Sequence, residues 1–326
     1  MTRVLSRRSF CAAVVEAGFL PASALFAADK PKEIRLDWAT YNPVSMLLKD
    51  KGWLEKEFAK DSIAIRWVQT LGSNKALEFL NAGSIDFGST AGSAALVAKI
   101  NGNPIKSIYV YSHPEWTALV VRRNSPINKV ADLKGKRVAV TRGTDPHIFL
   151  VRALLDAGLS EKDISPVLLQ HPDGKIALIR GDVDAWAGLD PMMALAEIEN
   201  GAQLLFRKPD ANTWGILNVR EDFLKDHPDL VRRVLAVYDE ARKYALANYD
   251  DLKKIFIAVT KLPDVVVDKQ LKERTDLTYS RVGGPQRESI LAAGLALQRA
   301  GVVPANVNIN ATVDALLDDR ITFAGN

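Results

Sequence analysis

The sequence of 326 residues contains a single cysteine, Cys11, which lies in a stretch expected to be removed. Residues 1–28 open with arginines, among them Arg7 and Arg8, continue with a mildly apolar stretch and end in small residues. This order is typical of an export signal peptide. A mature chain without cysteine forms no disulfide, uses no thiolate nucleophile and holds no cysteine-ligated metal.

The paired arginines leave two export routes open. The run S-R-R-S-F from Ser6 to Phe10 resembles a twin-arginine signal, although many ordinary export signals also begin with two arginines. Past residue 28, no apolar stretch reaches the roughly 20 residues that cross a bilayer. We therefore expect an exported chain without a membrane span.

Motifs of the common enzyme classes are also absent. The sequence contains no G-x-S-x-G, no G-x-x-x-x-G-K phosphate loop, no H-E-x-x-H and no dinucleotide fingerprint. Its 4 histidines lack the spacing of metal ligands. We expect no catalytic residue, no metal site and no cofactor.

Charge of one sign is not concentrated anywhere in the chain. There are 43 Lys and Arg against 39 Asp and Glu, without a dense basic stripe interleaved with aromatic residues. Such a stripe is the usual sign of a nucleic acid-binding surface. We expect no nucleic acid partner.

What the sequence does contain is an alternation of short apolar strands with helical segments. Ile34–Ala39 has the pattern of a strand, residues 74–82 that of a helix capped by Ser73 or Asn74, and Gly174–Arg180 that of a later helix. Strands that alternate with helices predict parallel β-α-β units with helices on both faces. The fold class is therefore α/β.

One motif occurs twice. L-x-x-G-S-I-D at residues 80–86 recurs as L-x-x-G-D-V-D at residues 178–184, and each copy follows a helix and precedes a buried strand. The repeat fits either coincidence within a common helix–turn–strand unit or two similar α/β lobes that face each other across a cleft. Such a cleft binds ligands where strand carboxyl ends meet helix amino ends.

Small and hydroxyl residues open the helices at three strand ends. The candidates are Ser73, Ser89, Thr90, Gly143 and Thr144. A helix amino end offers unpaired N–H groups and partial positive charge, so it can hold a sulfonate, sulfate or carboxylate without an arginine. The alternative is that these residues only cap their helices.

Three tryptophans fall at strand ends or loops of the expected cleft. Trp116, Trp186 and Trp214 would supply apolar walls for an organic group attached to the anion. The alternative is that they belong to the core.

Several segments resemble a known family. They are GWLEKEF (52–58), GSIDFGST (83–90), NSPINKVADLKGKRVAV (124–140), LVRALLDAGL (150–159) and GDVDAWAGLDP (181–191). The sequence resembles the periplasmic aliphatic sulfonate-binding proteins, the solute receptors of ABC importers in the nitrate, sulfonate and taurine group. The resemblance runs from about residue 33 to about residue 309.

The resemblance implies a type II periplasmic-binding-protein fold, with two α/β lobes around a ligand cleft. Residues 33–118 and 219–326 would form lobe I, and residues 119–218 lobe II. By the same similarity, Ser89, Thr90, Gly143, Thr144 and the segment from Trp186 to Asp190 fall on ligand-contact positions. The loop that contains Asn42 would also face the cleft.

The chain departs from the family at a helix start. Gly143-Thr144-Asp145-Pro146-His147 stands where relatives carry a run such as G-S-S-S-H. An ionised Asp145 repels a sulfonate unless it points away, caps the helix or pairs with a cationic ligand tail. If Asp145 caps the helix, the Asp145–His147 end is left for the organic tail.

The resemblance also implies a function and partners. It predicts a monomeric periplasmic protein that captures a small oxyanion, an organosulfonate, and delivers it to an ABC importer permease without chemical change. A receptor for sulfate esters, taurine or nitrate is the alternative within this group. An enzyme of thiamine-pyrimidine synthesis, which reuses the fold, is the remote alternative, and a sensor domain is a further class.

Overall fold

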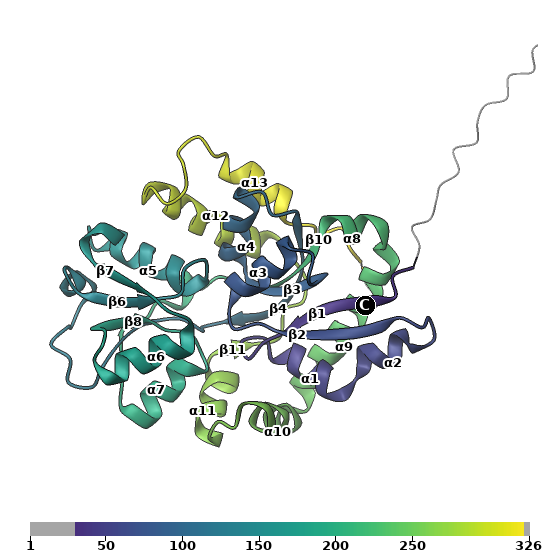
Figure 1. Cartoon of the computed structure of the whole chain (residues 1–326), viewed down its shortest axis with the longest axis horizontal. Helices are drawn as coiled ribbons and strands as arrows, with labels where there is room; N and C mark the ends of the chain where they lie inside the picture. Colours follow the sequence, from purple (N-terminus) through teal and green to yellow (C-terminus); the bar gives the residue numbers. More distant parts are fainter. Residues whose placement is uncertain (1–29, 323–326) are drawn as a thin grey trace, which may run out of the picture.

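The computed structural model describes residues 30–322, so the expected export signal at residues 1–28 lies outside the described residues. Within that range the chain forms two sheets, each covered by helices on both faces (Figure 1). No described helix is long and apolar enough to cross a membrane.

The first sheet runs in the order β11-β4-β10-β3-β1-β2. Its strands are β1 (Glu33–Trp38), β2 (Ala64–Gln69), β3 (Phe87–Ala91), β4 (Ile105–Pro114), β10 (Gly215–Arg220) and β11 (Thr275–Asp276). β1 is parallel to β2 and β3, whereas β10 is antiparallel to both β3 and β4.

The second sheet runs in the order β7-β6-β8-β5-β9. Its strands are β5 (Leu119–Val121), β6 (Arg137–Val140), β7 (Ser165–Leu168), β8 (Ala185–Ala187) and β9 (Gln203–Phe206). β6 is parallel to β7 and β8, and β5 is antiparallel to β8 and β9. Each sheet therefore has a parallel trio and one antiparallel strand that follows a crossing, with β4 and β11 beyond it in the first sheet and β9 beyond it in the second. This is the expected type II two-lobed fold.

The helices complete both lobes. They are α1 (Pro43–Lys51), α2 (Trp53–Ala59), α3 (Ser73–Asn81), α4 (Gly92–Ile100), α5 (Asp145–Asp156), α6 (His171–Arg180), α7 (Met192–Asn200), α8 (Glu221–Asp226), α9 (Pro228–Ala247), α10 (Tyr249–Thr260), α11 (Asp264–Asp268), α12 (Gly284–Arg299) and α13 (Ile309–Leu316). In Figure 1, α5 covers one face of the second sheet, and α6 and α7 cover the other.

The repeated motif forms the same contacts in both lobes. In the first, the Arg35 side chain donates to the Asp86 carboxylate and to the Gly83 carbonyl. In the second, Arg137 donates to Asp184 and to the carbonyl of Gly181. Both glycines have positive φ, at 65° and 84°, a conformation that glycine adopts without the Cβ penalty. The two copies of the motif therefore occupy equivalent positions and form equivalent contacts in the two lobes.

Two segments cross between the sheets. The first, residues 115–118, follows β4 and leads to β5, and the second, residues 207–214, follows β9 and leads to β10. Gly215 already pairs with Ala91 of the first sheet. The second lobe therefore ends before residue 215 and not at the expected residue 218.

Candidate functional site

Asp145 joins the two lobes at the start of α5. Its carboxylate accepts hydrogen bonds from Ser93 Oγ at 2.5 Å, Thr213 Oγ1 at 2.8 Å, Trp116 Nε1 at 2.9 Å and the Thr213 main-chain N–H at 3.0 Å. Ser93 belongs to the first turn of α4 in the first lobe, while Trp116 and Thr213 lie on the two crossing segments. The side chain of Asp145 does not cap α5, so that expectation was wrong.

The hydroxyls at the start of the first-lobe cleft are used within the protein. Ser89 Oγ donates to Asp37 Oδ1 at 2.8 Å and accepts from the Asn42 amide at 2.8 Å. Thr90 Oγ1 donates to the Ala91 carbonyl and accepts from Asn218. Both hydroxyl hydrogens are therefore donated to acceptors within the protein. The role of Ser89 and Thr90 as donors to a ligand stays a prediction.

The other two hydroxyls also have protein partners. Ser73 Oγ accepts the main-chain N–H of Ala91, at 3.0 Å, instead of capping α3. Thr144 Oγ1 donates to the carbonyl of Thr141 at 2.7 Å. Neither Ser73 nor Asn74 caps α3, because Gly72 occupies the N-cap position.

The remaining candidates of the second junction differ in position. Gly143 faces the first lobe, where a Cβ on it would lie 3.6 Å from Cβ of Asn74. The imidazole of His147 turns to its own lobe, with Nε2 3.0 Å from the Glu161 carboxylate. His147 therefore does not face an organic tail in the cleft.

The tryptophans separate into core and interlobe residues. Trp186 is fully buried in the second-lobe core, with Val120 and Ala139 among its cluster, so it forms no wall of the cleft. Trp116 packs edge-on against Tyr41 of the first lobe, with ring centroids 6.1 Å apart. Trp214 stacks on His113 at 4.0 Å.

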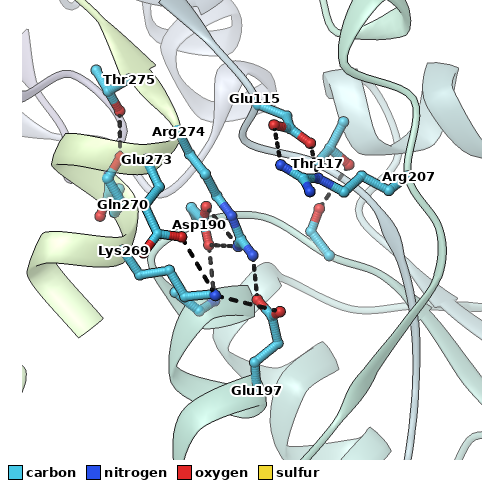
Figure 2. A network of polar contacts seen from close by, with 12 residues as sticks. Glu115, Thr117, Asp190, Glu197, Arg207, Lys269, Gln270, Glu273, Arg274 and Thr275 are labelled. Carbon is cyan, nitrogen blue, oxygen red and sulfur yellow. Dashed lines mark hydrogen bonds and ion pairs between the residues drawn. The ribbon is translucent and has the colours of Figure 1, made fainter. Parts of the chain in front are cut away.

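A second tie between the lobes is an ion-pair network (Figure 2). Arg274, which follows the π-helical turn Lys269–Glu273, places Nη1 3.2 Å from Asp190 Oδ2 and Nη2 2.5 Å from Glu197 Oε2. Asp190 and Arg274 are almost fully buried. Burial raises the pKa of Asp190 to about 6, against the attraction of Arg274, which lowers it. Arg207 and Glu115 pair beside them, one from each crossing segment.

A cavity of about 320 Å³ opens between the lobes. The first lobe lines it from the loop before α1, from β2 and from α10, and the second lobe from the first residues of α6 and α7. The lining residues are Trp38, Thr40, Tyr41, Gln69, Leu71, His171, Pro172, Leu189, Asp190, Pro191, Met192, Val259 and Thr260. Its volume is within the range of small-molecule sites. Of the twelve candidate residues, Asp190 lines this cavity.

The amino ends of α6 and α7 lie at this cavity. Pro172 stands in the first turn of α6, whose N-cap residue Gln170 makes no side-chain capping bond. The start of α7 is different, because Asp190 Oδ1 accepts the N–H of Ala194 at 2.8 Å. No lysine or arginine is among the described lining residues. An anion would therefore meet partial positive charge at α6 rather than a basic side chain.

His171 is the buried group of this cavity that sequence reasoning missed. We expected a helix from Gly174 and treated His171 as an ordinary histidine, but α6 begins at His171 itself. Pro172 was the available signal, since proline is frequent just inside a helix start. His171 is 2% exposed, and its Nε2 has no hydrogen-bond partner.

Asp37 lies directly behind the cavity wall. Its carboxylate accepts from Thr70 Oγ1 at 2.7 Å and from the N–H and hydroxyl of Ser89, both at 2.8 Å. Thr70 is also 3.0 Å from the hydroxyl of Tyr41, which lines the cavity. Burial raises the pKa of Asp37 to about 7, although these hydrogen bonds lower it.

A more basic hollow lies between α5 and the residues at the end of α12. It has a volume of about 450 Å³ and is lined by residues that include Arg142, Lys162 and Arg299. Arg142 has a side chain that is 59% exposed and lies 3.7 Å from the Glu161 carboxylate. Solvent screening and this partner weaken its attraction for an anion. The described residues contain no cluster of side chains able to hold a metal ion.

Known proteins are similar to this chain in sequence and in fold. The model of the NMT1/THI5-like family matches residues 46–251. An Escherichia coli (strain K12) protein named for binding aliphatic sulfonates is 32% identical over 82% of this chain and 84% of its own. A Bacillus subtilis (strain 168) protein of the same name is 30% identical over 76% of this chain and 75% of its own.

Solved structures agree with these sequence matches. The alkanesulfonate-binding protein SsuA of Xanthomonas axonopodis pv. citri, bound to MOPS, superposes with a TM-score of 0.80 at 26% identity, covering 89% of this chain and 99% of that one. A periplasmic nitrate-binding protein of Synechocystis PCC 6803 has a TM-score of 0.73 at 14% identity. The latter shows the fold alone.

Proposed function

Because this chain belongs to the NMT1/THI5-like family and, within it, to the aliphatic sulfonate-binding proteins, we propose that it is the periplasmic solute receptor of an ABC importer for an organosulfonate. The protein captures the ligand between its lobes and delivers it unchanged to a permease. The observation that carries the proposal is the interlobe cavity of about 320 Å³ at the uncapped amino end of α6.

The sulfonate is bound by the main chain rather than by a basic side chain. Its negative charge meets the N–H groups at the start of α6, and the apolar side chains of Trp38 and Leu189 contact the organic group. Asp190 contributes little repulsion, because Arg274 neutralises it from the first lobe. A sulfonate bound in this cavity contacts both lobes and therefore stabilises the arrangement in which the two lobes lie close together.

A ligand panel tests the function. The purified protein is melted with alkanesulfonates, taurine, a sulfate ester, sulfate and nitrate, and hits are measured by calorimetry. A ligand at about 100 times its dissociation constant stabilises the folded protein by about 2.7 kcal/mol. We expect organosulfonates to raise the melting temperature and to be recovered unchanged. Stabilisation by nitrate or a sulfate ester alone identifies another ligand class, and consumption of a ligand identifies an enzyme.

Leu168→Asp is the matched control for the place of binding. Leu168 lies on β7 of the same lobe as Leu189, is exposed and does not line the cavity, so the variant retains wild-type affinity. Leu189→Asp adds a carboxylate to the cavity lining and weakens sulfonate binding by at least about tenfold, the equivalent of about 1.4 kcal/mol. Equal affinity in both variants contradicts this site.

A further inference from the structure

Nε2 of His171, a residue that lines the cavity, is buried and has no hydrogen-bond partner. Thr141 Oγ1 donates its one hydrogen to the Leu169 carbonyl at 2.7 Å and lies 3.2 Å from His171 Nδ1. Since that hydroxyl has no second hydrogen, Nδ1 of His171 must carry the proton and donate it to Thr141. In the neutral ring Nε2 is then an acceptor. Burial lowers the pKa of His171 to about 3, so the ring stays neutral.

The first lobe contributes a second acceptor to the same place. Oδ1 of Asn74 is buried and has no partner. A Cβ on Gly72 would lie 2.8 Å from Asn74 Oδ1 and 3.3 Å from His171 Nε2, so the two acceptors flank the same point from opposite lobes. Gly72 has no side chain, so no Cβ of this residue fills the point between the two acceptors.

Buried acceptors without donors are costly, at about 1–3 kcal/mol each. No lysine or arginine is among the described residues that line the cavity, so no cation there repels a positively charged donor. A sulfonate oxygen is itself an acceptor and gives nothing to these atoms. The group that satisfies them must carry an N–H or an O–H.

We propose that the organic end of the ligand carries a hydrogen-bond donor, an ammonium or a hydroxyl, which binds His171 Nε2 and Asn74 Oδ1 between the lobes. The inference rests on the proposed function and narrows its substrate class to amino- or hydroxy-substituted sulfonates. His171 thereby selects the ligand by its organic end, while the amino end of α6 receives the sulfonate.

Three ligands of nearly equal size test the inference. Calorimetry compares 2-aminoethanesulfonate, 2-hydroxyethanesulfonate and propane-1-sulfonate, which differ at one terminal group. We expect at least one of the two donor ligands to bind about tenfold or more tighter than propane-1-sulfonate, because only a donor satisfies the buried acceptors. The amine and hydroxyl arms show which donor is preferred.

Two variants and a control connect the preference to this place. His171→Phe removes the acceptor, and the ratio of the affinities should fall to about one. Gly72→Ala puts a methyl group between the acceptors and has the same expected effect; its backbone, at φ 168°, is extended and accepts alanine. Gly72→Ala decides the question if His171→Phe does not fold. His113→Phe, outside the cavity lining, should keep the wild-type ratio.

The outcomes separate this inference from the function it rests on. If no sulfonate binds the wild-type protein, the proposed function fails and this inference with it. If all three bind equally well, the function stands and the inference is overturned. Equal binding would follow if the Asn74 amide turned its NH2 group toward His171. A preference that survives in both His171→Phe and Gly72→Ala also overturns it.

Discussion

Two places between the lobes bring a polar second-lobe side chain to the first lobe, with opposite results. At Asp145, four donors surround a carboxylate, and their hydrogen bonds are complete within the protein. At His171, a buried ring nitrogen faces the first lobe without a donor. The hydrogen bonds of the Asp145 carboxylate are satisfied within the protein, whereas Nε2 of His171 lacks a donor until a ligand supplies one.

This difference indicates which part of the cleft is available to a ligand. The Asp145 carboxylate occupies the hydrogen-bond donors of Ser93, Trp116 and Thr213. We propose that a sulfonate therefore binds elsewhere, in the cavity at the start of α6.

Arg274→Met should cause the largest loss, because it removes the charge that joins the lobes beside the cavity. Asp190 and Glu197 would then be left without their buried partner, which costs about 3–5 kcal/mol in unfolding free energy. Chemical denaturation measures the loss. Arg287→Met is the matched control: its pair with Asp314 is exposed, so the change should stay within about 0.5 kcal/mol. Similar small losses in both would show that the Arg274 contact does not stabilise the folded form.

Asp37→Asn tests how the buried carboxylate behind the cavity affects stability, for comparison with the carboxylate of Asp145. Burial raises the folded-state pKa of Asp37 from 3.8 to about 7. Between about pH 4 and 7 the folded protein therefore holds a proton that the unfolded chain releases, and stability falls as pH rises through this window. Asp37→Asn should remove that part of the fall, at most about 4 kcal/mol.

Denaturation of both proteins at pH 4, 5, 6 and 7 measures this difference. The raised pKa of Asp190 contributes equally to both, so it cancels from the comparison. Parallel curves would mean that the hydrogen bonds from Thr70 and Ser89 keep Asp37 ionised in the folded state.

Asp145→Asn should have the smallest effect of the three on stability and none on affinity. The amide oxygen retains the acceptor for Ser93 and Thr213 Oγ1, but the NH2 group replaces the oxygen that accepts both the Trp116 Nε1–H and the Thr213 N–H, at a cost of about 1–3 kcal/mol. Calorimetry with a sulfonate should give the wild-type dissociation constant. Binding that tightens tenfold or more would show that Asp145 competes with the ligand for one place.

Local patterns predicted the scaffold well. The two-lobed fold was predicted from the alternation of strands and helices, from the motif repeated at residues 80–86 and 178–184, and from the family resemblance. The first two patterns are readable in the sequence because they depend on contacts within a few tens of residues. The helix start at Thr144 was also recognisable, whereas Ser89 lies within β3 and α4 begins only at Gly92. Whether the hydroxyls of Ser89 and Thr144 were free was not recognisable, because their acceptors, Asp37 and the Thr141 carbonyl, are set by folding.

The interlobe contacts were beyond local patterns. Asp145 meets Ser93 and Thr213, and Arg274 meets Asp190, across long separations in the sequence. Composition and periodicity carry no information on how two lobes approach. His171 was missed for a local reason instead: the start of α6 was placed three residues late, which hid the histidine's position at a helix amino end.

A crystal structure with a bound sulfonate from the ligand panel tests the central claim most directly. Our account predicts the sulfonate oxygens within hydrogen-bond distance of the first main-chain N–H groups of α6, with Asp145 still bonded to Ser93, Trp116 and Thr213. A sulfonate bound on Ser93 and Thr213, with the Asp145 carboxylate displaced, would contradict it.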